Sequence, residues 1–176
     1  TGSIDDGFYL AQIGGLSLKN NRIDKSLLEH MTNDGYEDLI DSVAPAADGK
    51  YNLGEFDFAS GSGWMYSVNG AFPNYGFSDY YPQDGDVVRV QFTLCLGKDL
   101  GGSDAVGFGS KNYADNHPNY AKIHPFVADI VNNNYFGKSD ELLNSVLNKV
   151  GKWNVEQKTI DDCIAELNKF YYGEMS

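Results

Sequence analysis

The residue types that carry nucleophilic catalysis are sparse in this sequence. The chain of 176 residues has three histidines, His30, His117 and His124, and two cysteines, Cys95 and Cys163. A hydrolase of the Ser/His or Cys/His kind needs its base within hydrogen-bond reach of a nucleophile, and a nucleophile on a sharp turn is commonly flanked by glycine. No histidine here adjoins such a serine or cysteine, and we interpret all three as exposed loop residues. We therefore predict that the chain is not an enzyme and has no catalytic residue.

Acidic side chains at one turn could hold a cation. Asp84 and Asp86 flank Gly85, and Asp79 lies nearby. Oxygen ligands in an acidic loop suit calcium, but the twelve-residue series of an EF-hand is absent. Aspartates at a turn also bond to their own backbone, which explains these residues without an ion. The cysteines and histidines lack the spacing of a zinc site, so we predict no metal and no resident cofactor.

Aromatic side chains concentrated between residues 64 and 81 are the best candidates for a binding surface. Trp64 and Tyr66 alternate along an extended stretch and share one strand face, which predicts a core position. Other rings lie on loop-like ground among Gly, Pro and Asn, where tyrosine supplies rigid contact area at binding sites. The same rings could instead cover the open end of a small core, and both interpretations stay open. The candidate ligand-binding residues are Phe72, Tyr75, Tyr80 and Tyr81.

The charge balance excludes two classes of partner. The chain has 13 basic and 25 acidic residues and a formal net charge of −12. A field of that sign repels nucleic acid and anionic lipid surfaces. No uninterrupted apolar run is long enough to cross a bilayer, so no membrane span is predicted. With 41% hydrophobic residues, the chain can form a packed core.

The order of the expected elements divides the chain near residue 110. Residues 1–110 have the pattern of strands and turns, with Asn69-Gly70 and Asp84-Gly85 as tight turns. Residues 36–43 have apolar side chains at helical spacing and are predicted to be a helix. Residues 111–176 have the pattern of three short helices. The predicted class is therefore α+β, with a domain over 1–110 and a helical module over 111–176.

The strongest expected strand covers residues 87–96. Strict alternation predicts that Val88, Val90, Phe92, Leu94 and Leu96 form its buried face. Arg89, Gln91, Thr93 and Cys95 then lie on the opposite face. This parity directs Cys95 away from the apolar side, whereas Cys163 lies on the apolar stripe of the last helix. We predict that these two thiols are not bonded to each other.

Residues 61–92 contain a series of short motifs: Gly63-Trp64-Met65-Tyr66, Val68-Asn69-Gly70, Gly76, Asp79-Tyr80 and Asp84-Gly85-Asp86. This series resembles the β-grasp domain similar to the C-terminal domain of transcobalamin, a domain family of unknown function in Gram-positive secreted and surface proteins. The resemblance covers about residues 1–105. It implies a β-grasp-like mixed sheet with short helices, which here lacks its first elements. Its motif residues, interpreted as mainly structural, are Trp64, Tyr66, Asn69, Gly70, Asp79, Asp84, Gly85 and Asp86. Residues 120–172 resemble the small helical repeats of the FIVAR type and imply a three-helix bundle.

The resemblance implies a function as well as a fold. We expect a non-catalytic adhesion or binding module on the surface or in the cell wall of a Gram-positive bacterium. The alternative is a small-molecule domain for a corrinoid or cobalamin-like ligand. The expected partners are a surface ligand or neighbouring domains of the same protein. A sheet that lacks elements before Gly7 has an open edge, so a homodimer through that edge is also expected.

Overall fold

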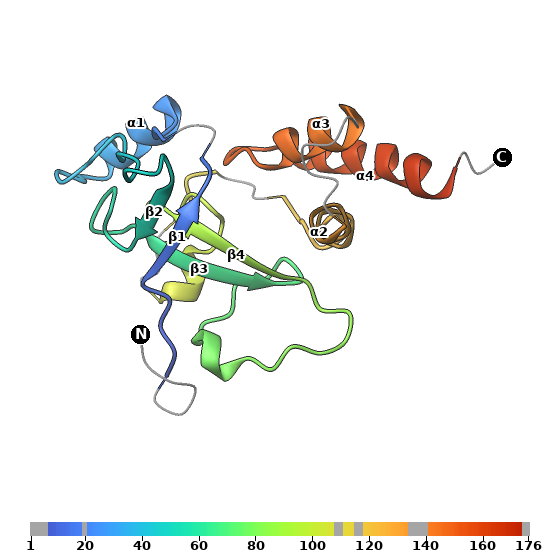
Figure 1. The fold of residues 1–176 in the computed structure, drawn as a ribbon, viewed down its shortest axis with the longest axis horizontal. Helices are drawn as coiled ribbons and strands as arrows, with labels where there is room; N and C mark the ends of the chain where they lie inside the picture. The colour runs from blue at the N-terminus through green and yellow to red at the C-terminus, as the bar shows by residue number, and fades with distance from the viewer. Residues whose placement is uncertain (1–6, 19–20, 108–110, 115–117, 134–140, 174–176) are drawn as a thin grey trace.

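The computed structural model describes residues 7–18, 21–107, 111–114, 118–133 and 141–173 and has the predicted α+β class (Figure 1). The strands are β1 (Gln12–Leu16), β2 (Tyr51–Gly54), β3 (Gly63–Val68) and β4 (Val88–Thr93). The helices are α1 (Lys25–Asn33), α2 (His124–Asn132), α3 (Glu141–Val150) and α4 (Gln157–Tyr172). Two short 3-10 turns, η1 (Phe77–Asp79) and η2 (Ser103–Val106), flank β4 in sequence. In the described part of the chain, no helix has the length and apolarity that crossing a membrane requires.

The described strands form two antiparallel pairs in place of the expected single mixed sheet. β1 pairs with β2, with Ile13 opposite Leu53, and β3 pairs with β4, with Trp64 opposite Phe92. No ladder joins β2 to β3 among the described residues. Instead, the indole nitrogen of Trp64 donates to the carbonyl oxygen of Leu53 at 2.9 Å. One side-chain hydrogen bond thus links the two pairs where the expected sheet would have a backbone ladder.

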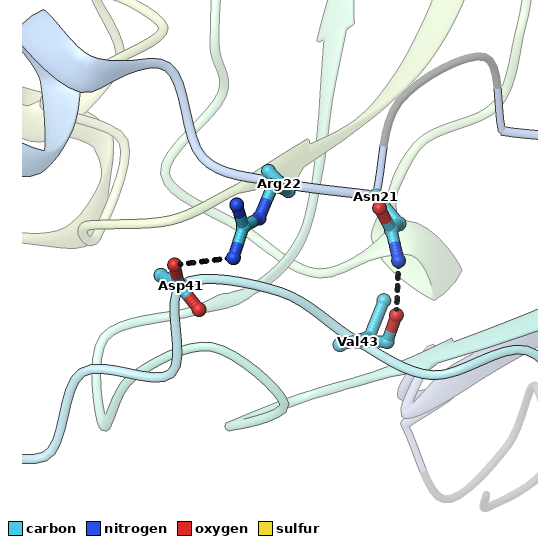
Figure 2. A network of polar contacts seen from close by, with 4 residues as sticks. All are labelled: Asn21, Arg22, Asp41 and Val43. Carbon is cyan, nitrogen blue, oxygen red and sulfur yellow. Dashed lines mark hydrogen bonds and ion pairs between the residues drawn. The ribbon is translucent and has the colours of Figure 1, made fainter.

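The helix predicted over residues 36–43 does not form. Its backbone instead pairs with the strand-like stretch before α1, because Arg22 makes an isolated bridge with Ser42. Figure 2 shows the side chains that fix this pairing: Arg22 meets Asp41 at 3.2 Å, and the Asn21 amide donates to the Val43 carbonyl at 2.8 Å. The apolar spacing was that of a helix, but partners distant in sequence take up the backbone groups that a helix would use.

Both predicted tight turns are present. Asn69 and Gly70 have φ angles of 50° and 87°, the conformation that an Asn-Gly pair tolerates best. Val68 and Ala71 close the turn with two backbone hydrogen bonds of 2.8 and 2.9 Å. The chain after the turn pairs with β3 only at Ala71 and forms no hairpin strand. The partner of β3 is β4, which follows a long loop. Gly85, at the second turn, has a φ of 90°.

Two apolar clusters form the core. The three helices predicted after residue 110 are present, and they contribute to one cluster the buried residues Ile123, Ile130, Leu143, Val146, Val150, Val155, Ile160, Cys163 and Leu167. The other cluster joins α1 and the strands through Ile23, Leu27, Met31, Leu53, Phe58, Ala59 and Cys95. Both cysteines are free thiols, one in each cluster. Trp153, between α3 and α4, packs against the second cluster, so the helical part contacts the strand part. The domain division at residue 110 stays a prediction.

The predicted faces of β4 are reversed at its first half. Val88 and Val90 are 39% and 42% exposed, although alternation assigned them to the core. Arg89 is half-buried on the face that lines a cavity toward α2. Cys95, predicted to point away from the apolar side, is fully buried, and Thr93 at the same parity is buried too, because this is the covered face. Which face of β4 is covered depends on where the later helices pack. The alternation of apolar and polar residues along the strand carries no information on that packing.

Candidate functional site

An aromatic groove of about 290 Å³ lies between the N-terminal segment and the loop after β3. We define the aromatic groove by the rings that line it: Phe8, Tyr9, Trp64, Tyr66, Tyr75 and Phe77. The strand β3 supplies two of these rings, the loop around η1 supplies two, and the chain before β1 supplies two. Segments distant in sequence therefore converge on one apolar surface.

Tyr66 holds the loop side of the aromatic groove in place. Its hydroxyl donates toward the carbonyl oxygens of Tyr75 and Gly76, at 3.3 and 3.1 Å. Its ring lies 4.4 Å from that of Phe77, which in turn meets Phe8 edge-on at 6.2 Å. Burial raises the pKa of Tyr66, so the hydroxyl remains a donor at neutral pH. The groove is thus fixed by contacts within the protein.

The four predicted ligand residues lie in different places. Tyr75 lines the aromatic groove and is 46% exposed, and Tyr80 stacks near it at 6.5 Å between ring centroids. Tyr81 is 74% exposed and lies outside the groove. Phe72 is turned to the opposite side, where its ring packs against Gly102. The structure therefore brings Tyr75 and Tyr80 together and separates Phe72 and Tyr81 from them.

The motif residues form a hydrogen-bonded network around Asp86. Its carboxylate accepts from the Asn69 amide at 2.8 Å, from the Gln83 backbone N–H at 2.8 Å, and from the Tyr80 hydroxyl. The hydrogen bond from Tyr80 is the main cause that lowers the pKa of Asp86, and the same bond raises the pKa of Tyr80 to about 12. Asn69 also accepts from the backbone N–H of Val87 at 3.0 Å. These contacts fasten the loop that supplies the groove.

Metal-binding chemistry finds no support in the described part of the chain. No group of three or more His, Cys, Asp or Glu side chains is close enough there to hold an ion. Asp86 is engaged in the network with Tyr80, and Asp79 lies in η1. The contacts of Asp86 fasten the loop that precedes β4.

A second hollow, which we name the interlayer cavity, was missed by sequence reasoning. It has a volume of about 610 Å³ and is lined from β3 and β4 on one side and from α2 and the α3–α4 connection on the other. Its defining polar residues are Arg89, Gln91 and His124, with Tyr120 between strand and helix. The signal in the sequence was a lone arginine inside the most apolar strand.

The prediction that the histidines are exposed loop residues is wrong for His124. Its side chain is only 4% exposed, since α2 begins at this residue and packs toward the strands. Its ring stacks on Tyr120 at 5.6 Å. His30 is exposed as predicted, but it lies on α1 and not in a loop, and it stacks on Tyr113 at 5.1 Å. His117 lies outside the described residues.

Comparison with known proteins finds a family match for one stretch of the chain. Residues 25–93, from the start of α1 to the end of β4, match the model of a domain of unknown function, DUF4430. The matched stretch holds Asn69, Asp86 and the loop between them, and it covers less than half of the chain. No curated protein and no solved structure matches the sequence.

Proposed function

We propose that the chain is a non-catalytic binding module of an exported Gram-positive surface protein, of the transcobalamin C-terminal-like β-grasp type. The observation that carries the proposal is the aromatic groove, whose rings are both fixed and accessible. Phe8, Tyr9 and Tyr75 are 39%, 49% and 46% exposed at its rim. Exposed aromatic rings gathered at one site are typical of a contact surface.

The chemistry of the groove supports binding over catalysis. Its walls are rings, and the polar groups of Trp64 and Tyr66 are already paired within the protein. The Tyr9 hydroxyl donates to Glu55 at 2.5 Å, and this bond raises the pKa of Tyr9. Each ring that stacks on a ligand contributes about 1 kcal/mol beyond its buried area. A few such contacts suit an adhesive module that acts in many copies on one surface.

The test is a binding screen with a matched pair of variants. Beads carrying the chain are exposed to arrays of glycans and extracellular-matrix proteins. We expect Tyr75→Ala to remove binding, since it deletes an exposed ring of the groove. Tyr172→Ala, which deletes a 72% exposed ring at the end of α4, is expected to keep it. Equal binding by both variants would contradict the assignment of the groove.

The alternative is a corrinoid-binding or cobalamin-like-binding domain, and the interlayer cavity is the observation that bears on it. Its volume of about 610 Å³ is in the range of small-molecule pockets. A whole corrinoid is larger than this volume and would extend out of the cavity. Titration with free cobalamin separates the two functions. An adhesion module is expected to bind it weakly or not at all, because micromolar affinity needs about 8 kcal/mol from one domain. A dissociation constant below about 1 μM would place the carrier function first.

A further inference from the structure

The interlayer cavity has an apolar wall and a polar end. Figure 1 shows α2 near the end of β3, and the turn at Gly70 approaches the backbone nitrogen of Ala121, just before α2. The strands, α1 and the loops contribute apolar side chains to the lining, among them Leu27, Phe72 and Phe92. Arg89, Gln91 and His124 contribute the polar groups. Such a lining fits a molecule with one polar end and an apolar body.

His124 is a buried side chain whose hydrogen-bonding capacity is unused. Neither ring nitrogen has a hydrogen-bond partner among the described residues, although the side chain is only 4% exposed. Burial, with a smaller contribution from the charge of Arg89, lowers the pKa of His124 to about 4. The neutral ring then has one N–H to donate and one nitrogen to accept. A buried polar group without a partner destabilises the fold, and a ligand that supplies the missing hydrogen bond removes that cost.

Arg89 is a half-buried cation that packs on an aromatic ring. Its guanidinium lies 5.4 Å from the centre of the Tyr120 ring, the same ring on which His124 stacks. No ion pair with an acidic side chain is found for it within the described ranges, in a chain of net charge −12. Burial lowers its pKa, which reflects the loss of solvent around the charge.

The other charged groups that line the interlayer cavity do not neutralise Arg89. The carboxylate of Asp24 caps α1 and accepts from the backbone of Ser26 at 2.9 Å. The carboxylate of Asp99 accepts from Thr93 at 2.5 Å and from the backbone of Leu94 at 2.9 Å. Lys152 adds a further positive charge from the α3–α4 connection. The cavity therefore offers cationic and neutral donors that an anion could use.

We propose that the interlayer cavity binds a small amphipathic anion. Its oxygen atoms accept hydrogen bonds from the guanidinium of Arg89 and from the N–H of His124, and its apolar part lies against the leucine and phenylalanine wall. A planar guanidinium binds a carboxylate through two parallel hydrogen bonds, which fixes the orientation of the ligand. This site is separate from the aromatic groove and goes beyond the adhesive function proposed for it.

The test compares two eight-carbon probes, one with a charged and one with a neutral head group. Octanoate ends in a carboxylate and 1-octanol in a hydroxyl, and their alkyl chains differ by a single methylene. Calorimetric titration of the whole chain is expected to show octanoate binding at least about tenfold more tightly, as charge-assisted hydrogen bonds imply. Nuclear magnetic resonance of the wild-type chain is expected to show octanoate shifting the His124 ring signals. Equal affinity for the two probes, or no shift at His124, would overturn the proposal.

Substitutions of Arg89 test whether this residue causes the tighter binding of octanoate. Arg89→Gln is expected to weaken octanoate binding about tenfold and to leave 1-octanol unchanged. Arg22→Gln removes an exposed arginine paired with Asp41 and serves as the matched control. If Arg89→Gln fails to fold, Arg89→Lys keeps the charge without the fork and is expected to bind octanoate at an intermediate affinity. Tyr75→Ala is expected to bind octanoate like the wild type, which separates this site from the groove. Undiminished octanoate binding by the folded Arg89 variants would refute the site.

Discussion

The side-chain amide of Asn69 donates to the carboxylate of Asp86 at 2.8 Å and so joins the turn after β3 to the segment that leads into β4. The loop between these two residues carries the tyrosines and phenylalanines of one wall of the aromatic groove. Asp86 is therefore the point at which the loop is tied to the strands, and its charge state should govern how firmly the groove is held.

Asp86→Asn should lower the melting temperature of the chain at neutral pH. The folded-state pKa of Asp86 lies below its ordinary value of 3.8, so its contribution to stability is present above that value. The contribution is lost as the pH falls through the folded-state pKa. Melting curves of wild type and variant should therefore differ near pH 7 and converge as the pH falls through the folded-state pKa of Asp86. Asp84→Asn removes the same charge outside this network, and a difference as large as that of Asp86→Asn would contradict this role.

Gly70→Ala should destabilise the chain more than Gly85→Ala. Both glycines have positive φ angles, 87° and 90°, so both substitutions introduce backbone strain of about 1 kcal/mol. A Cβ at Gly70 would also lie 3.2 Å from the backbone nitrogen of Ala121, whereas one at Gly85 meets nothing within 4 Å. The extra crowding should add about 1 kcal/mol. Urea titrations measure both changes in the free energy of unfolding, and equal losses would mean that the turn does not pack on the start of α2.

Gly70→Val should be worse still. A β-branched residue is strongly disfavoured at positive φ, and it adds two methyl groups at the same crowded point. An unchanged melting temperature for this variant would show that the assignment of the Asn69-Gly70 turn is wrong.

Both thiols should resist alkylation in the native chain. Cys95 and Cys163 are fully buried, and burial raises the pKa of Cys95 to about 12 and that of Cys163 above its usual range. A raised pKa leaves less of each thiol as the thiolate that reacts with iodoacetamide, and burial also blocks access to it. Mass spectrometry should find no label on the folded chain and two labels after unfolding without reductant, because both thiols are free. An unlabelled unfolded chain would mean a disulfide.

The open edge of the β1–β2 pair should support a dimer. Within the described residues each of these strands has one partner, so one edge of β1 is unpaired there. We expect light scattering to show association as the protein concentration rises toward millimolar. Gln12→Lys places a charge on β1 and should reduce it. A strict monomer at millimolar concentration would exclude this contact.

The features of the fold that could be predicted from the sequence are those determined by residues close together in the chain. The turn at Asn69-Gly70 follows from the backbone preference of two residues, and α4 follows from its own apolar stripe. The reversed face of β4 and the burial of His124 depend on helices that pack from a distant part of the chain. Likewise, no local pattern shows that residues 36–43 pair with the stretch at Arg22.

The candidate site was predictable in part for the same reason. Loop composition indicated loop positions for Tyr75 and Tyr81 but left their exposure open, and the structure shows both rings exposed. Composition could not show that the Tyr80 hydroxyl is held by Asp86, or that Phe72 turns to the other side of the strands. Arg89 and His124 meet Tyr120 only after the chain has folded.

Because Trp153 packs on the strand-side core, its fluorescence can report whether the helices remain in contact with that core. Its ring meets that of His30, on α1, edge-on at 5.5 Å, although it lies in the connection between α3 and α4. The other tryptophan, Trp64, belongs to β3. In a Trp64→Phe chain the remaining emission comes from the junction alone. A red shift that precedes loss of helical circular dichroism would report the helices lifting away from α1 while they are still folded.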